Sequence, residues 1–168
     1  MPVLDDVLAP GLCAVVCGSA VSAASARAGA YYANPQNRFW RTLHEVGLTP
    51  RQLAPAEYRR LRDHGIGLTD LAKHESGADW TLSPSAYDPD GLAARIAPLA
   101  PGALAFNGKA PAVAFFGNAA LAYGRQTGGL GAIPVFVLPS TSPAARRYWD
   151  IAPWRDFADF VKRIKAER

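Results

Sequence analysis

The chain has 168 residues, of which 49% are hydrophobic, and its formal net charge is +4. This length supports one compact domain with a sizeable core but not two ordinary ones, so we expect a single domain over residues 1–168. Cys13 and Cys17 are the only cysteines, which excludes an iron–sulfur cluster held by four thiolates, and strand alternation predicts both as buried thiols on the same face. The sequence has no secretory signal pattern and no apolar run of about 18 residues, so we expect a cytoplasmic protein.

The first predicted strand covers Leu12–Cys17, a continuous apolar run that Gly18 ends. A loop rich in alanine and serine follows this strand. Asn34 and Pro35 then offer an N-cap and a first-turn proline for a helix that ends at Gly47. This part of the chain therefore predicts a buried strand, a loop and one helix.

The next part of the chain combines a helix, a short strand and a long loop. Thr49 opens a stretch with the spacing of a capping box, which predicts a helix that runs to His64. Ile66–Leu71 is predicted as a short strand or a strand-like turn. Lys73–Tyr87 has no clear hydrophobic period, so we expect a long loop of the type that often carries function.

The second half of the chain alternates helices and strands. The predicted elements are a helix that begins at Asp88-Pro89, a strand at Ala103–Phe106, a further helix, a glycine-rich connection around Gly128-Gly129, a strand at Ile133–Leu138 and an amphipathic helix from about Pro153. Such alternation predicts the α/β class and a three-layer α/β/α sandwich with a mostly parallel central sheet.

Polar residues stand where four of the predicted strands end. These ends are Gly18-Ser19, Thr69-Asp70, Asn107-Gly108-Lys109 and Ser140-Thr141-Ser142. Ligands of open α/β sheets bind outside the carboxyl ends of the strands. The sequence therefore predicts one pocket at this edge of the sheet, whichever single motif is considered.

Two segments beside these ends have an unusual composition. Residues 31–40, YYANPQNRFW, combine aromatic rings, amides and a guanidinium, which suits the stacking of a flat heterocycle beside a polar reaction. Residues 138–147, LPSTSPAARR, place small hydroxyl side chains ahead of paired arginines. Hydroxyl and arginine side chains are frequent partners of phosphates, so this second segment is suited to contact with a polyanion.

Several of these motifs resemble known enzymes. Residues 32–40 are similar to the segment after the first motif of the mismatch-specific uracil and thymine DNA glycosylases, and Asn107-Gly108-Lys109 is similar to their third-strand end. Gly18-Ser19, Tyr31-Tyr32 and residues 138–144 are closer to the hypoxanthine-DNA glycosylase branch. In this order the motifs resemble the uracil-DNA glycosylase superfamily from about Leu12 to Arg147, which implies its α/β/α fold.

The resemblance implies a DNA repair enzyme of base excision repair. We expect a monofunctional glycosylase that cleaves the N-glycosidic bond of a deaminated base, with uracil as the first choice, and leaves an abasic site. It implies no metal and no cofactor, a DNA partner that contains uracil or another deaminated base, no membrane, and a monomer. A hypoxanthine-preferring glycosylase, a damaged-DNA binding module with weak or lost catalysis, and a hydrolase of free nucleosides are the alternatives.

Two residues are candidates for activating water in this reaction. Ala20 stands where the mismatch-specific enzymes carry the asparagine that positions water, and Ser140 stands near the histidine of the classical uracil enzymes. Asn37 corresponds to the working amide of the hypoxanthine branch, whereas Asp70 matches an aspartate of that branch and is the better general base. The sequence leaves this choice open, and it also leaves open that Asn37 only braces its loop and that Asp70 is a structural turn acceptor.

The other expected roles concern the base. Tyr32 is the candidate stacking ring for a nucleobase that has left the duplex. Backbone N–H groups near Gly18, Ser19 and Tyr32 are candidates for holding the charge of a base carbonyl. Asn107 is the candidate reader of the Watson–Crick edge.

The remaining candidates contact DNA. Ser140, Ser142 and Arg146 are expected to hold phosphates. Ala144 stands where the family inserts a wedge into the vacated stack, and alanine is too short for that purpose. Arg146 or Arg147, or the long loop near Trp80, is therefore expected to fill the gap.

Overall fold

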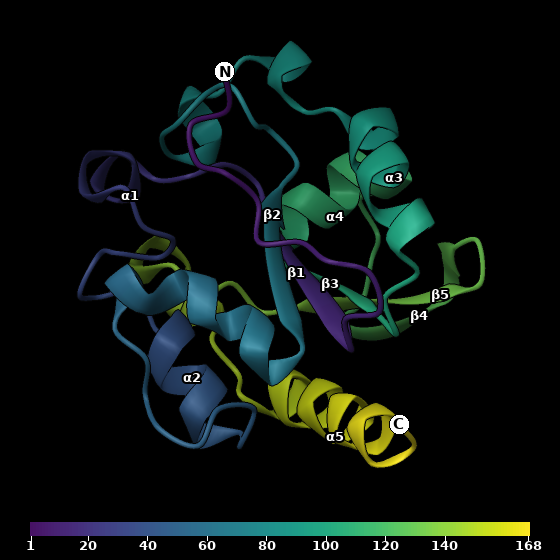
Figure 1. The fold of residues 1–168 in the computed structure, drawn as a ribbon. Helices are drawn as coiled ribbons and strands as arrows, with labels where there is room; N and C mark the ends of the chain where they lie inside the picture. The colour runs from purple at the N-terminus through teal and green to yellow at the C-terminus, as the bar shows by residue number, and fades with distance from the viewer.

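The computed structural model describes residues 1–168 and has one five-stranded sheet at its centre (Figure 1). The strands are β1 (Ala14–Gly18), β2 (Ile66–Asp70), β3 (Leu104–Asn107), β4 (Gly124–Leu130) and β5 (Ile133–Leu138), in the spatial order β2-β1-β3-β5-β4. Neighbouring strands are parallel except for β4, which pairs with β5 in the antiparallel direction. The predicted mostly parallel sheet is confirmed.

Helices cover both faces of this sheet. The α-helices are α1 (Ala23–Ala28), α2 (Phe39–Glu45), α3 (Pro89–Ile96), α4 (Lys109–Phe116) and α5 (Ala152–Ala166), and the longest 3-10 helix is η1 (Pro55–His64). Alternate residues of a strand point to opposite faces, so the strands supply two cores. One core contains Ala14 and Val16 with α2, η1 and α5, and the other contains Val15 and Cys17 with α3 and α4. The predicted three-layer α/β/α sandwich is thus confirmed.

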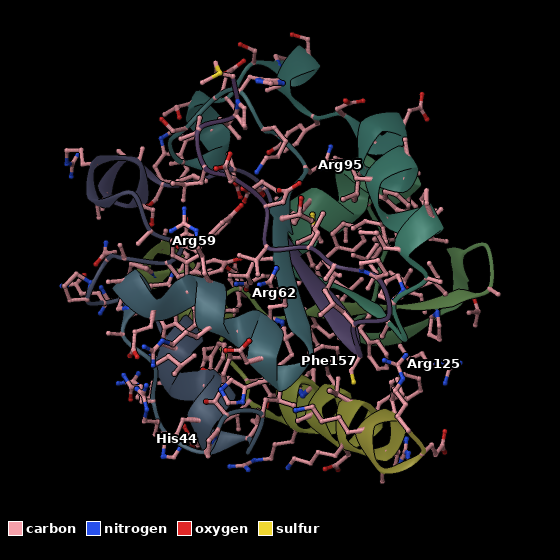
Figure 2. The ribbon with its side chains drawn as sticks, viewed as in Figure 1. His44, Arg59, Arg62, Arg95, Arg125 and Phe157 are labelled. Atoms are coloured by element: carbon pink, nitrogen blue, oxygen red, sulfur yellow. The ribbon has the colours of Figure 1, made fainter.

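The last helix, α5, packs against the sheet through its apolar residues. Phe157 of α5, labelled in Figure 2, is fully buried. It packs edge-on against Phe136 of β5, with ring centroids 5.4 Å apart. Burial of a phenylalanine side chain of this kind stabilises a fold by about 1.5–3 kcal/mol. None of the helices in this fold is both long and apolar enough to cross a membrane.

Three predictions for the first half of the chain are wrong in detail. The loop after β1 contains helix α1, whose first turn is capped by the Ser22 hydroxyl, which accepts from the Ser25 N–H. Asn34 does not cap α2, because its Oδ1 accepts from the Gln36 N–H and closes a local turn instead. The Thr49 hydroxyl is buried without a hydrogen bond, and the helix after it begins only at Pro55.

Two further predictions need correction. The glycine-rich connection around Gly128-Gly129 is part of strand β4, whose residues are mostly exposed and therefore lack the apolar pattern that signals a strand. Cys13 and Cys17 are both buried, as predicted, but they lie in different cores. Cys13 precedes β1, so the alternation of the strand does not reach it.

Candidate active site

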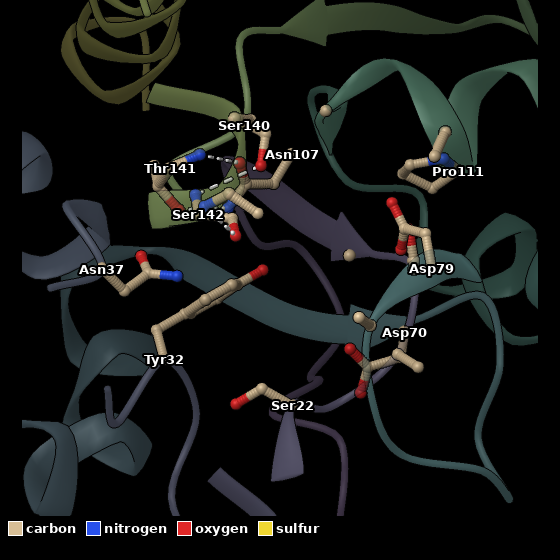
Figure 3. Close-up of a pocket in the computed structure, with 18 of the residues that line it drawn as sticks. Ser22, Tyr32, Asn37, Asp70, Asp79, Asn107, Pro111, Ser140, Thr141 and Ser142 are labelled. Carbon is tan, nitrogen blue, oxygen red and sulfur yellow. Dashed lines mark hydrogen bonds between the residues drawn. The ribbon is translucent and has the colours of Figure 1, made fainter. Parts of the chain in front are cut away.

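One large cavity opens at the carboxyl ends of the parallel strands, as the sequence predicted. Its volume is about 460 Å³, a size in the usual range for small-molecule sites. Nine of the eleven predicted site residues line it: Gly18, Ser19, Tyr32, Asn37, Asp70, Asn107, Ser140, Ser142 and Ala144. Arg146 and Arg147 do not line it, although both are exposed on the adjoining 3-10 helix η5 (Pro143–Tyr148). Residues from four strand ends therefore meet in one hollow (Figure 3).

The Tyr32 ring forms one wall of the cavity. It stacks on Phe39 with ring centroids 4.0 Å apart and an interplanar angle of 27°, so Phe39 covers one face of the Tyr32 ring and holds the ring in place. The backbone of Tyr32 has a φ of 51°, a left-handed conformation that is costly for a bulky residue. Strain of this kind is often held at functional sites, and here it turns the ring toward the cavity.

The hydroxyl of Tyr32 is a buried polar atom without a hydrogen-bond partner. It lies close to Gly18, because a Cβ added to that glycine would stand 3.1 Å from this oxygen. Burial, and then the nearby charge of Asp70, raises the pKa of Tyr32 above its ordinary value, so the phenol keeps its proton. The wall of the cavity therefore holds a protonated hydroxyl that is buried and makes no hydrogen bond of good geometry within the protein.

Asp70 lies opposite, at the end of the edge strand β2, and is buried. Its Oδ2 accepts hydrogen bonds from the Tyr31 hydroxyl at 2.9 Å and from Lys73 Nζ at 3.2 Å. Its Oδ1 accepts none and stands 3.3 Å from the position of a Cβ at Gly18. Burial raises the pKa of Asp70 above its usual range, against the opposing effects of Lys73 and Tyr31. The site thus holds an oriented carboxylate with one free oxygen and a strengthened affinity for protons.

Asn107 is tied to the neighbouring strand end. Its Nδ2 donates to the Thr141 hydroxyl at 2.9 Å, and its Oδ1 accepts from the Thr141 N–H at 3.0 Å (Figure 3). Thr141 is fully buried, so this reciprocal pair joins the ends of β3 and β5. An amide has a second N–H and a second lone pair, and only these remain for a ligand.

Asn37 and the two serines also make local bonds. Asn37 Oδ1 accepts from the Phe39 N–H at 2.9 Å, which leaves its Nδ2 directed into the cavity (Figure 3). Ser140 Oγ accepts from the Ser142 N–H, and Ser142 Oγ accepts from the Ala144 N–H, both at 3.2 Å. Since each hydroxyl uses an acceptor site, its own O–H is available to donate outward.

The mouth of the cavity carries Trp80, whose loop the sequence named as a candidate to fill the vacated stack, and also Tyr148 and Asp79, which the sequence did not single out. Trp80 is 79% exposed and Tyr148 is 62% exposed, and both line the cavity. Apart from Met1 they are the exposed large hydrophobic side chains of the chain. Asp79 is a second carboxylate of the lining, exposed and without a side-chain hydrogen bond. No local pattern marks Asp79 or Tyr148, because only the fold brings them to the cavity, whereas Thr141 belongs to the polar strand end that the sequence predicted there.

Other possible ligand positions are less well formed. A second hollow of about 380 Å³ lies on the other side of Tyr32 and Asn37, against Gln52 and Leu53. No group of three or more histidine, cysteine, aspartate or glutamate side chains is arranged to hold a metal ion. Ala20 lines the main cavity and contributes no polar side chain there.

The fold and the cavity together define an α/β sandwich protein with a ligand site at the carboxyl ends of its strands, built from an aromatic wall, a buried carboxylate and amides. The family model for the uracil DNA glycosylase superfamily matches residues 6–165, so this chain belongs to that superfamily. It is also similar to the solution NMR structure of a "putative Uracil DNA glycosylase" from Methanosarcina acetivorans, with a TM-score of 0.64 and 24% sequence identity. The similarity covers 95% of this chain and 96% of the other, and it shows a shared fold.

Proposed function

We propose that this protein is a monofunctional DNA glycosylase that hydrolyses the N-glycosidic bond of a deaminated base in DNA, with uracil as its substrate. Membership of the superfamily supports this reaction class. The observation that carries the proposal is the convergence of the Tyr32 ring, Asn37 and the free oxygen of Asp70 in one cavity at the end of the sheet. These three groups supply a stacking surface, a hydrogen-bond donor and a general base.

The substrate base must leave the duplex to reach this cavity, because its glycosidic bond is enclosed by stacked neighbours. We assign the extruded base to the face of Tyr32 that Phe39 does not cover. The Asn37 Nδ2 is a donor that lacks a partner within the protein and points into the cavity, so it can donate to an oxygen atom of the base or the sugar.

Asp70 is our candidate for activating water. Its Oδ1 accepts a proton from a water molecule whose oxygen bonds to the anomeric carbon, while the N-glycosidic bond breaks and its electron pair leaves with the base. Asn37 is less suited to this step, because its Oδ1 already accepts from the Phe39 N–H. Burial raises the pKa of Asp70, and a carboxylate with a higher pKa is a stronger general base.

The departing base carries negative charge and needs stabilisation. Backbone groups around Ser19 and the first residues of α4, Lys109 and Ala110, line the cavity. The amino end of a helix carries partial positive charge, so α4 favours an anion at this position. Preorganised dipoles of this kind are often the largest single contribution to catalysis.

The DNA backbone is assigned to the loop between β5 and α5. Ser140 and Ser142 present outward O–H donors at the cavity, and Arg146 and Arg147 are exposed on the following turn. Ala144 is too short to fill the vacated stack, whereas Trp80 and Tyr148 are large, exposed and close to the mouth. We assign the filling of the stack to one of these rings, because aromatic side chains stack on bases without sequence preference.

The direct test is incubation of the purified protein with single-stranded and duplex oligonucleotides that contain uracil, hypoxanthine, xanthine or no lesion, followed by alkaline cleavage of abasic sites. We expect cleavage at uracil. Cleavage only at hypoxanthine would retain the reaction class and change the base. Binding of uracil-containing DNA without turnover would replace the enzyme by a damaged-DNA binding module, and faster hydrolysis of free uridine would replace it by a nucleoside hydrolase.

A further inference from the structure

The ammonium group of Lys73 lies among four oxygen atoms, one of which belongs to Asp70, the candidate general base. Its Nζ donates to the Leu4 carbonyl at 2.9 Å, the Tyr31 hydroxyl at 3.2 Å and Asp70 Oδ2 at 3.2 Å, and it lies 2.8 Å from Asp6 Oδ1. The side chain is only 10% exposed. An ammonium has three donors, so every N–H of Lys73 is used within the protein.

A second cation and a second carboxylate extend this network. Asp6 Oδ1 accepts from the Thr69 hydroxyl at 2.7 Å, and Asp6 Oδ2 lies 3.3 Å from Arg95 Nε. Arg95, from α3 and labelled in Figure 2, also donates to the Asp70 carbonyl at 2.8 Å. Two cations and two carboxylates therefore balance one another next to the cavity, and neither Lys73 nor Asp6 lines it.

The N-terminal segment brings Asp6 and the Leu4 carbonyl to this place. The Val3 N–H donates to the Lys73 carbonyl at 2.8 Å, and Val7 and Leu68 exchange two backbone hydrogen bonds of 2.9 Å. Leu4 and Val7 are buried in the core. Residues 3–7 are thus packed along the edge strand β2, the strand that ends in Asp70.

We propose that Lys73, held in place by residues 3–7, is the positioning residue of the active site: it fixes Asp70 Oδ2 so that Oδ1 faces the cavity as an ionised base. The inference rests on the proposed function, because it assigns how the base of that same site is oriented. Lys73 touches neither the cavity nor the reacting atoms, so its effect passes through Asp70. The N-terminal segment then belongs to the active site although it is remote from it in sequence.

Two charged neighbours shift the pKa of Asp70 in opposite directions. Lys73 lowers the pKa of Asp70 from the value that burial alone imposes, whereas the charge of Asp6 raises the pKa of the same carboxyl. The titratable and charged groups that face Asp70 from the elements around it are Lys73, Tyr31, Asp6, Arg95, Cys17 and Tyr32. Removal of Lys73 and removal of Asp6 must therefore move the titration of Asp70 in opposite directions.

The experiment compares the wild type with Lys73→Met and Asp6→Asn. The pH dependence of kcat and KM on uracil-containing DNA is measured for each protein, and the Asp70 carboxyl is titrated by carbon-13 NMR, with Asp70→Asn used to assign its signal. We expect the acid limb of kcat to move to higher pH in Lys73→Met and to lower pH in Asp6→Asn. For Lys73→Met, kcat on that limb falls about tenfold for each pH unit of the shift, with KM unchanged.

Lys73→Arg is the conservative variant, and it should restore the position of the acid limb because it keeps the charge. Shifts in the same direction for Lys73→Met and Asp6→Asn, or an unchanged limb in Lys73→Met, would overturn the proposal. If Lys73→Met does not fold, Asp6→Asn decides by the sign of its shift alone. A wild type that cleaves no substrate would refute the proposed function only, since the NMR titration still tests whether Lys73 and Asp6 act on Asp70 with opposite signs.

Discussion

The floor and the mouth of the cavity are built in contrasting ways. On the floor, Asp70, Asn107 and Thr141 are buried and bonded to partners within the protein. At the mouth, Trp80 and Tyr148 are mostly exposed and stand on short 3-10 turns rather than on strands. Side chains on rigid strand ends hold a fixed geometry, whereas those on surface turns adapt to what they meet. Under the proposed function, we therefore expect the floor to carry out the chemistry and the mouth to recognise DNA.

The largest expected effect comes from the floor. Asp70→Asn removes the candidate base and keeps the size of the side chain, so kcat should fall by roughly 10²–10⁴ while KM changes little. Single-turnover rates on uracil-containing duplexes measure this. Asp79→Asn is the matched comparison, because Asp79 is the other carboxylate of the lining but is exposed and has no fixed hydrogen bond. An equal or larger loss of kcat in Asp79→Asn would show that the general base is Asp79, at the mouth, rather than Asp70.

A second test crowds the floor instead of removing a group. The Cβ of Gly18→Ala stands 3.1 Å from the Tyr32 hydroxyl and 3.3 Å from Asp70 Oδ1, so one of the two must shift. The neighbour has to give by only a few tenths of an ångström, which is less than the misplacement of about 1 Å that can cost about a hundredfold in rate, so we expect a loss in kcat/KM smaller than a hundredfold. Gly128→Ala is the control, since its Cβ meets nothing within 4 Å. Wild-type kinetics in Gly18→Ala would show that the space beside this glycine is not used.

We expect substitutions at the mouth to weaken the binding of DNA rather than to slow the reaction. Trp80→Ala and Tyr148→Ala each remove a candidate ring for stacking on unpaired bases, a contact worth roughly 1–3 kcal/mol per base. We expect a weaker Kd for uracil-containing duplexes by that amount in the variant that lacks the filling ring, with the single-turnover rate at saturation close to the wild type. Fluorescence anisotropy measures the binding, and Trp80→Phe should recover part of it. Unchanged affinity in both alanine variants would leave the vacated stack to an arginine.

The smallest expected effect belongs to the exposed arginines. Arg146→Gln and Arg147→Gln each remove one candidate phosphate contact, so the slope of log Kd against log salt should decrease by about 1 per contact. Titrations between low and moderate salt measure this slope. Arg163→Gln, on α5 away from the cavity lining, serves as the control. A slope that does not change in either variant would place the DNA backbone on another surface.

Local sequence predicted the strands because their apolar runs are continuous. Ala14–Gly18 and Leu104–Asn107 are buried throughout, and both begin and end within two residues of the predicted bounds. Strand β4 escaped prediction because its residues are mostly exposed and its glycines are typical of a turn. Its pairing with β5, rather than an apolar pattern, makes it a strand.

The sequence is sufficient to predict where the site lies, but not which hydrogen bonds its residues make. Because parallel strands end at one edge of a sheet, the sequence alone is enough to group Asp70 with Asn107. The partners of these side chains come from distant parts of the chain: Tyr31 is 39 residues from Asp70, and Thr141 is 34 residues from Asn107. Asp6 lies 63 residues from Thr69, and no local pattern marks such a contact. The roles assigned to these residues remain predictions that the variants above test.

The most direct test of the central claim is a crystal structure of Asp70→Asn with a uracil-containing oligonucleotide, in which slow turnover keeps the substrate whole. We predict an extruded base stacked on Tyr32, with the anomeric carbon of its sugar facing residue 70. A base seated instead in the hollow beside Gln52 and Leu53, or an oligonucleotide bound with its uracil still in the stack, would contradict this claim.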